Sequence, residues 1–258
     1  MATANAQHYT PQELMVVCAA RQIRDGEVVF VGMRLPLVAF ALAKRTHAPD
    51  AVGLFENGLV RETPSRELLL TMGDSPNLLG AAWATHTTTL LGLLAQGFAQ
   101  LGFVGGAEVD RFGNLNTSYI GPREHPKVKL PGSGGGADIA SLAGRLAIIM
   151  AHERNRFPER VNYITSPGYG DGNNWRARVG LPRGGPAAVI TTRAVLGFTA
   201  ETHEMELQSW HPGSNADEVR ANTGWDLRIA PDARETPPPT TDELRIIREC
   251  DPDGFWTR

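Results

Sequence analysis

Short apolar runs separated by turn residues organise the chain, and they predict strands that alternate with helices. Residues 27–32 (EVVFVG) and 51–55 (AVGLF) have the length and composition of strands, and residues 35–44 (LPLVAFALAK) between them have those of a helix. The same patterns predict a helix over residues 95–100 and further strands over residues 101–104, 145–150, 161–165 and 187–191. The alternation favours a layered α/β structure.

Helix-start signals occur near both ends of the sequence. Thr10, Pro11 and Glu13 combine an N-cap, a first-turn proline and a capping-box partner, and they predict a helix that stops near Asp25 and Gly26. Residues 236–258 predict a stiff proline linker followed by a terminal helix with a second capping box. A chain of 258 residues can form one large core or two lobes, and we treat residues 1–258 as a single domain.

Composition excludes several classes of protein. The 25 basic and 28 acidic residues give a formal charge of only -3, so no basic field attracts nucleic acid or anionic lipid. No apolar run approaches the ~20 residues that span a bilayer, and residues 1–10 (MATANAQHYT) do not resemble a secretory signal. Cys18 and Cys250 lack metal-site spacing and are expected to be buried free thiols, which favours a reducing cytoplasm.

A glutamate follows one of the predicted strands directly. Glu56 comes after residues 51–55 and precedes Asn57 and Gly58, a pair that favours a turn. This order places a carboxylate at the carboxyl edge of a sheet, where α/β proteins commonly build their sites. On spacing alone, a turn glutamate that points into solvent is the more common explanation, so the motif by itself is weak evidence.

Two groups of glycines allow a ligand to approach the backbone closely. Gly105 and Gly106 follow a predicted strand, and residues 132–136 (GSGGG) precede a helix predicted from Asp138. Amides of this loop can donate to an oxyanion or a thioester, although a purely structural turn remains open. The loop also satisfies a loose dinucleotide fingerprint, but a proline and a short basic stretch stand where a central strand should precede it.

Other catalytic classes find little support. There is no GxSxG elbow, and Ser133 has no neighbouring histidine, so a serine hydrolase is not indicated. The seven histidines show no helical pairing, so no metal site is predicted. The long segment 166–186 is rich in glycine, proline and asparagine, and we interpret it as an ordered functional loop or a flap that faces a partner.

Six stretches, taken in their order along the chain, resemble the β subunits of class I coenzyme A transferases. The resemblance covers nearly the whole chain and is strongest to glutaconate CoA-transferase. The six stretches are VGMRLPLVAFALAKRTHAPD with the following Glu-Asn-Gly, GGAEVDRFGNLNTSYIG, LPGSGGGADIAS, HERNRFPERVNYITSPG, VITTRAVLGF and ANTGWDL. The resemblance implies an open, mostly parallel α/β sheet with flanking helices, of the CoA-transferase type.

The same resemblance implies a mechanism and a site. Glu56 occupies the position of the family's nucleophile, which attacks an acyl-CoA and becomes a glutamyl-CoA thioester. Amides of Gly134, Gly135 and Gly136, with Gly105 and Gly106, are the candidate donors to the oxyanion or to CoA. Arg34 and Asn57 are candidate substrate contacts. Asn57 stands where glutaconate enzymes have serine, which leaves the acceptor acid open.

The resemblance also implies partners and competing functions. It implies an α-type subunit in a heterotetramer or larger complex, CoA as a substrate and no tightly bound cofactor. We expect CoA transfer between an acyl-CoA and a small, dicarboxylic acid. A CoA-thioester hydrolase or ring-opening enzyme on the same scaffold is the alternative, and a non-catalytic subunit that shapes the pocket is a third hypothesis.

Overall fold

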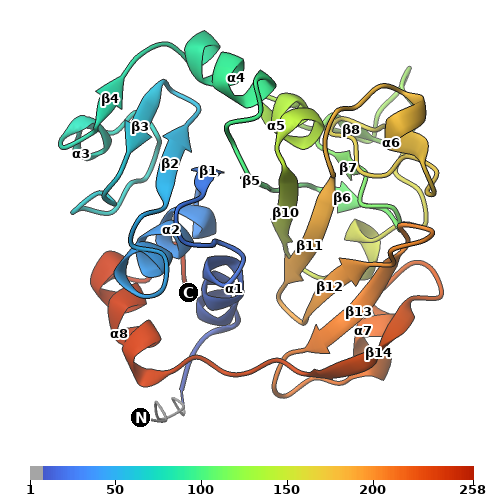
Figure 1. The fold of residues 1–258 in the computed structure, drawn as a ribbon. Helices are drawn as coiled ribbons and strands as arrows, with labels where there is room; N and C mark the ends of the chain where they lie inside the picture. Colours follow the sequence, from blue (N-terminus) through green and yellow to red (C-terminus); the bar gives the residue numbers. More distant parts are fainter. Residues whose placement is uncertain (1–7) are drawn as a thin grey trace. The chain divides into compact units, whose positions relative to one another are not determined.

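The computed structural model describes residues 8–258, which form two compact units (Figure 1). One unit contains the described residues up to Phe103 together with Pro237–Arg258, and the other contains Val104–Thr236. The chain length allows one large core or two lobes, and the structure has two compact units. The grouping of residues 1–258 as one domain stays a prediction. The expectation that residues 1–10 form no secretory signal falls largely outside the described part of the chain.

The first unit is a sheet with helices packed against it. Its strand order is β5-β1-β2-β3-β4, in which β5, β1 and β2 run parallel and the remaining pairs are antiparallel. The elements in chain order are α1 (Pro11–Ala20), β1 (Val28–Phe30), α2 (Leu35–Arg45), β2 (Val52–Phe55), β3 (Leu59–Arg61), α3 (Ser75–Leu78), β4 (Trp83–Ala84), α4 (Thr87–Ala95), β5 (Leu101–Val104) and α8 (Thr241–Cys250).

Helices α1, α2 and α8 pack against one another in this unit (Figure 1). Every residue of α1 from Glu13 to Ala20 is buried, which explains why this helix is apolar on all sides. Both predicted capping boxes are present, Thr10 with Glu13 in α1 and Thr240 with Glu243 in α8. The buried Glu13 also accepts a hydrogen bond of 2.8 Å from the Arg248 guanidinium, which ties α8 to α1.

The second unit contains five further sheet strands and two small hairpins. The sheet order is β14-β13-β12-β11-β10, with parallel pairs β10–β11 and β13–β14 and antiparallel pairs between them. Its elements are β6 (Glu108–Val109), β7 (Leu115–Asn116), β8 (Tyr119–Ile120), β9 (Val128–Lys129), α5 (Gly136–Leu142), β10 (Arg145–Met150), the 3₁₀ helix η1 (Arg154–Arg156), α6 (Trp175–Arg178), β11 (Pro186–Thr191), β12 (Ala194–Phe198), β13 (Met205–Trp210), α7 (Ala216–Ala221) and β14 (Arg228–Glu235).

The predicted α/β class, with an open sheet and flanking helices, is confirmed. Parallel pairing occurs in β5-β1-β2, β10–β11 and β13–β14, whereas β3 and β4 and the pairs of β12 are antiparallel. Among the described residues, no helix is both long enough and apolar enough to cross a membrane.

Two predicted elements are wrong. Residues 161–165 form no strand, because this apolar run lies at the surface, where Tyr163 and Ile164 are exposed. The helix predicted over residues 95–100 lies earlier, at Thr87–Ala95, since the chain turns after Gln96 through Gly97 in the left-handed region.

Two buried histidines in the second unit are held in their neutral form. His152 lies between the Thr191 and Thr223 hydroxyls, 3.0 and 3.2 Å from its ring nitrogens, and stacks on Phe157. Burial, aided by nearby positive charge, lowers its pKa to about 3. Burial likewise lowers the pKa of His211 to about 4. These groups stabilise the fold fully only when the pH lies above the ordinary histidine value.

We predict that the second unit loses stability in mild acid and that His152→Gln reduces this effect. Below about pH 6.5 the unfolded chain binds protons that the folded chain does not, so the free energy of unfolding falls as the pH drops towards 4. The free energy of unfolding is measured with urea at several pH values between 7 and 4. Its slope against pH should correspond to about one bound proton less in the variant than in the parent protein. The exposed His125→Gln serves as the control, and equal slopes in all three proteins would contradict the prediction.

Candidate active site at the carboxyl edge of the first unit's sheet

Two candidate residues follow neighbouring parallel strands of the first unit. Strand β1 pairs with β2 in a parallel register that sets Phe30 beside Leu54. Glu56 follows the last residue of β2 directly, and Arg34 lies at the start of α2, four residues after Phe30. Carboxyl ends of parallel strands meet at one edge of a sheet. The fold therefore brings Glu56 and Arg34 to the same edge.

Glu56 opens a three-residue hairpin turn between β2 and β3. The pair Phe55–Leu59 closes the hairpin, and the Gly58 amide donates to the Phe55 carbonyl at 2.9 Å. Gly58 has φ +101, and a Cβ added there would lie 2.2 Å from the Thr85 carbonyl oxygen. Only glycine fits this close approach, so the Glu-Asn-Gly order has a structural cause.

The neighbours of Glu56 hold the turn in place. Glu56 is half-buried, and Asn57 is exposed. The side-chain amide of Asn57 donates to the Met72 carbonyl, so its nitrogen is engaged with the chain itself. The Thr85 amide donates to the Gly58 carbonyl at 2.8 Å. These contacts fix the turn from both sides and limit the directions in which the carboxylate of Glu56 can move.

The loop between β3 and β4 is organised by a buried cation. The Arg61 side chain is 2% exposed and donates to several carbonyls of the loop, including those of Thr63 and Leu79. Burial lowers the pKa of this guanidinium. The hydrogen bonds from one central guanidinium to several carbonyls hold this long loop in one conformation. The same loop contains Met72, whose carbonyl accepts the hydrogen bond from Asn57.

Arg34 has an unusual backbone and an aromatic neighbour. It has φ 70 and ψ -125, which places a non-glycine residue in the left-handed half of conformational space. Its guanidinium carbon lies 5.3 Å from the ring centroid of Trp256. The Trp256 indole nitrogen in turn donates to the Leu69 carbonyl at 3.0 Å.

The candidate glycines belong to the second unit and flank the β6–β7 hairpin. Gly105 and Gly106 precede β6, and a Cβ at Gly106 would lie 2.6 Å from a Leu115 methyl group. On the other side, the Gly132 amide donates to the Thr117 carbonyl directly after β7. The hairpin is braced by the Asn116 side chain, which donates to the buried Glu108 carboxylate at 2.7 Å.

The glycine loop ends at the first turn of α5, which begins at Gly136, two residues earlier than predicted. The Gly136 amide donates to the Ser133 carbonyl at 2.8 Å, so this proposed donor would have to give up an existing bond to hold a ligand. Before the loop stands β9, an exposed two-residue strand in an antiparallel hairpin. A dinucleotide fingerprint requires a buried parallel strand there, so the fingerprint is not supported.

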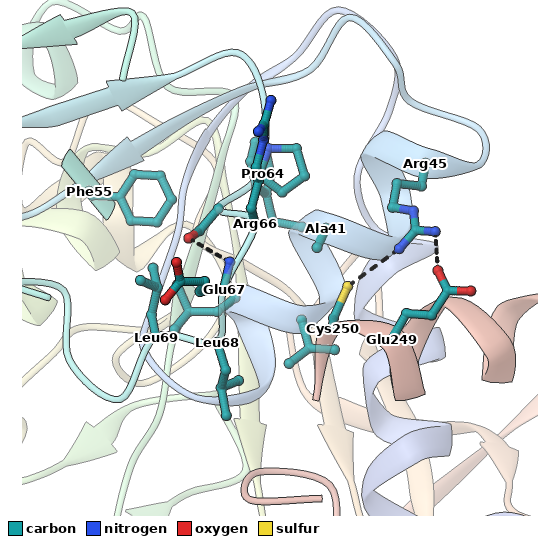
Figure 2. A pocket seen from close by; sticks show the side chains of 14 residues that line it. Ala41, Arg45, Phe55, Pro64, Arg66, Glu67, Leu68, Leu69, Glu249 and Cys250 are labelled. Atoms are coloured by element: carbon teal, nitrogen blue, oxygen red, sulfur yellow. Dashed lines mark hydrogen bonds and ion pairs between the residues drawn. The ribbon is translucent and has the colours of Figure 1, made fainter. Parts of the chain in front are cut away.

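A separate recess lies beside α2 and α8 in the first unit (Figure 2). It is lined by Phe40 and Phe55, the segment 64–69, and Arg45 with its ion-pair partner Glu249. Cys250 also lines it, and burial raises the pKa of this thiol. The recess contains neither Glu56 nor Arg34 and offers no reactive nucleophile.

Other chemistry-bearing groups lie apart from these residues. Both cysteines are free; Cys18 is buried, and burial raises its pKa to about 12, whereas Cys250 is half-buried. Within residues 8–258, no group of three or more histidine, cysteine, aspartate or glutamate side chains could hold a metal ion. A half-buried carboxylate at a constrained turn is thus the strongest candidate for covalent chemistry in the described chain.

Comparison with known proteins places the whole chain in a family. The family model described as coenzyme A transferase matches residues 13–222. The chain belongs to the coenzyme A transferase family. It is 39% identical over 241 residues to the B subunit of 3-oxoadipate CoA-transferase from Pseudomonas knackmussii, a match that covers 93% of this chain and 92% of that protein.

A second relative is known in sequence and in structure. The B subunit of glutaconate CoA-transferase from Acidaminococcus fermentans is 36% identical over 252 residues, covering 95% of this chain and 94% of that one. The crystal structure of glutaconate CoA-transferase from the same organism superposes with a TM-score of 0.92 at 35% identity, over 97% of this chain and 98% of the other. The predicted CoA-transferase type of fold is confirmed.

A more distant relative has a hydrolase name. The cholesterol ring-cleaving hydrolase IpdB subunit of Mycobacterium tuberculosis is 30% identical over 258 residues, covering 96% of this chain and 98% of that protein. Both transferase relatives are more similar to this chain than the hydrolase is.

Sequence reasoning missed Trp256 and the loop built around Arg61. The signal for Trp256 was a turn sequence, Asp-Pro-Asp-Gly, directly after the terminal helix, since aspartate and glycine in that order favour a tight turn. Arg61 gave no signal, because an arginine at the end of a short strand is normally solvated.

We predict that Gly58→Ala destabilises the first unit and abolishes activity. The added methyl group would meet the Thr85 carbonyl, and the backbone would be strained, so the free energy of unfolding should fall by about 2–4 kcal/mol. Gly26→Ala is the matched control, since Gly26 has φ +72 with nothing within 4 Å. It should lose only about 1–2 kcal/mol. Equal losses in chemical denaturation would show that the Thr85 contact is unimportant.

Proposed function

We propose that this chain is the β-type subunit of a CoA-transferase that moves CoA between an acyl-CoA and a small dicarboxylic acid. Glu56 acts as the nucleophile. The observation that carries the proposal is the half-buried glutamate at the constrained Glu-Asn-Gly turn, at the carboxyl edge of β5-β1-β2, in a member of this family. Edges of this kind present side chains to ligands without burying them in the core.

The proposed chemistry proceeds through two covalent states. A carboxylate oxygen of Glu56 attacks the acyl-CoA carbonyl carbon, the C–S bond breaks, and the CoA thiolate leaves a mixed anhydride behind. The thiolate then attacks the glutamyl carbon, which releases the donor acid and forms the glutamyl-CoA thioester. The acceptor carboxylate repeats both steps in reverse and restores Glu56. No net proton is consumed.

Backbone amides are the proposed source of oxyanion stabilisation. Each tetrahedral intermediate carries a negative oxygen, and preorganised N–H donors stabilise it more than they stabilise the planar ground state. We assign this role to amides of Gly134 and Gly135, with Gly136, Gly105 and Gly106 as further CoA contacts. The Gly136 amide already donates to the Ser133 carbonyl, so it would exchange this bond for one to the ligand.

The transferase relatives support a partner subunit and a diacid substrate. Both are named as the B subunits of their enzymes, so we propose that this chain functions with an α-type subunit in a heterotetramer or larger complex. The acids in their names, 3-oxoadipate and glutaconate, are dicarboxylates. Arg34, a cation at the same edge as Glu56, is our candidate contact for the second carboxylate, with Asn57 beside it.

Two further parts of the proposal concern cofactor and location. CoA enters as a substrate, and we propose that no tightly bound cofactor is needed, since both covalent steps use carboxylate and thiolate groups alone. A cytoplasmic location is proposed because both cysteines are free, as is usual in a reducing compartment.

Hydrolysis is the second candidate, and the similarity to the IpdB subunit favours keeping it. In a hydrolase, water would replace the acceptor acid. Free CoA would then appear in proportion to the acyl-CoA added, without any acceptor. A transferase should release at most one equivalent of the donor acid per Glu56 when no acceptor is present, because the enzyme waits as its thioester.

We predict that Glu56 carries the covalent intermediate. The complex with its α-type partner is incubated with a panel of acyl-CoA donors and then reduced with borohydride, which converts a glutamyl thioester to an alcohol. Peptide mass spectrometry should locate the change at Glu56. Glu56→Ala should reduce transfer by at least about 10³-fold, since the covalent route itself is lost.

Glu62→Ala is the matched control for this experiment, because Glu62 is an exposed glutamate that follows the same hairpin. It should retain transfer and remain unmodified. Full activity in Glu56→Ala would exclude the proposed mechanism and favour a non-catalytic subunit.

A further inference from the structure

The residues after α8 form a compact turn built around one aspartate. The Asp251 carboxylate is 2% exposed and accepts from the amides of Phe255, Trp256 and Thr257, at 2.7, 2.9 and 3.0 Å, and from the Thr257 hydroxyl. We call residues 251–257 the hook. Four donors on one buried carboxylate define a single conformation, since an unpaired donor or acceptor there would be costly.

The hook is also attached to the first part of the chain. The Thr10 hydroxyl donates to the Thr257 carbonyl, and Thr10 is the N-cap of α1. The Trp256 indole donates to Leu69 in the loop that Arg61 organises. The Trp256 ring is therefore fixed along its edge as well as through its backbone. Its face lies against the Arg34 guanidinium.

Arg34 is an unfavourable residue for its place in several respects. Its backbone, with φ 70, is strained for a residue with a Cβ. It is the N-cap of α2, yet it makes no side-chain capping bond, and a cation is disfavoured at the positive end of a helix. Glycine would relieve the backbone strain, and a side chain that accepts hydrogen bonds would suit the N-cap better than arginine does. A strained residue of this kind points to a role other than stability.

The contact with Trp256 holds the Arg34 guanidinium without using its N–H donors. Among the described residues, Arg34 makes no ion pair or side-chain hydrogen bond, and its guanidinium carbon lies over the Trp256 ring, 5.3 Å from the centroid. A cation–π contact of this kind holds the group while its N–H donors stay available, and these donors match a carboxylate or phosphate. The N-terminus of α2 adds positive potential at the same point.

We propose that the hook is a positioning device: Trp256 holds Arg34 so that its guanidinium binds the second carboxylate of the acid that reacts at Glu56. This inference rests on the proposed function. A CoA phosphate offers the same anionic oxygens. However, Arg34 and Glu56 follow neighbouring parallel strands, whereas the pantetheine arm separates the thioester from the phosphates by a long chain. A carboxylate on the acyl group lies nearer the reacting carbon than a phosphate does, so we favour the carboxylate.

The test compares Trp256→Leu, Trp256→Phe and Arg34→Gln in the complex with its α-type partner. With glutarate against valerate as acceptor, Trp256→Leu should lower the ratio of kcat/KM for diacid over monoacid by about tenfold, mainly through the KM for glutarate. Trp256→Phe keeps an aromatic face and should restore most of the ratio. Trp83→Leu, at an exposed tryptophan of β4, is the matched control and should change the ratio less than about twofold.

Two further measurements complete the test. Adding Trp256→Leu to Arg34→Gln should change the ratio little more than Arg34→Gln alone, because both act on one contact. Arg34→Gly should raise the Tm by a few degrees while it lowers the diacid preference, since it relieves strain and removes the cation.

Several results would overturn the inference. Equal losses with glutarate and valerate in Trp256→Leu would show that the hook acts on stability alone. A raised KM for a monocarboxylic acyl-CoA would assign Arg34 to a CoA phosphate. Glutarate binding by calorimetry needs no turnover, so it distinguishes failure of this inference from failure of the proposed function. Unchanged glutarate affinity in Arg34→Gln would exclude the contact even if Glu56 carries the intermediate.

Discussion

The close approach of Gly58 to the Thr85 carbonyl is the contact on which the geometry of the candidate site depends. It requires a residue without a side chain directly after Glu56 and Asn57, and it joins the β2–β3 turn to the segment between β4 and α4. Because the turn is short and clamped, the glutamate cannot move away from the sheet edge without breaking the hairpin. A nucleophile that must meet both an acyl carbon and a thiolate gains from such a restricted position.

The same edge carries features that lower stability, namely a strained arginine at the start of α2 and a half-buried carboxylate at the β2–β3 turn. The buried Arg61, which has only carbonyl partners, lies beside Gly53 at the other end of β2. The remainder of this unit is conventional, with apolar helices, two capping boxes and an ion pair between Arg248 and Glu13. Unfavourable local choices gathered at one edge of an otherwise consistent structure are typical of a functional site.

The patterns that sequence reasoning reads well are those set by local chemistry. The run at residues 145–150 became β10, the capping signals at Thr10 and Thr240 start helices, and the Glu-Asn-Gly order forms the expected turn. Residues 161–165 show the limit, because an apolar run does not reveal whether tertiary packing will cover it. The contact of Arg34 with Trp256 could not be found this way, since more than two hundred residues separate partners that meet only in the folded unit.

The order of the two units along the chain has a consequence for biosynthesis. Residues 237–258 belong to the first unit but leave the ribosome after the whole of Val104–Thr236. Until then α1 and α2 lack the helix that packs against both of them through Leu244, Ile246 and Ile247. The intervening segment is continuous and can fold while translation proceeds, whereas the unit that bears Glu56 is completed last.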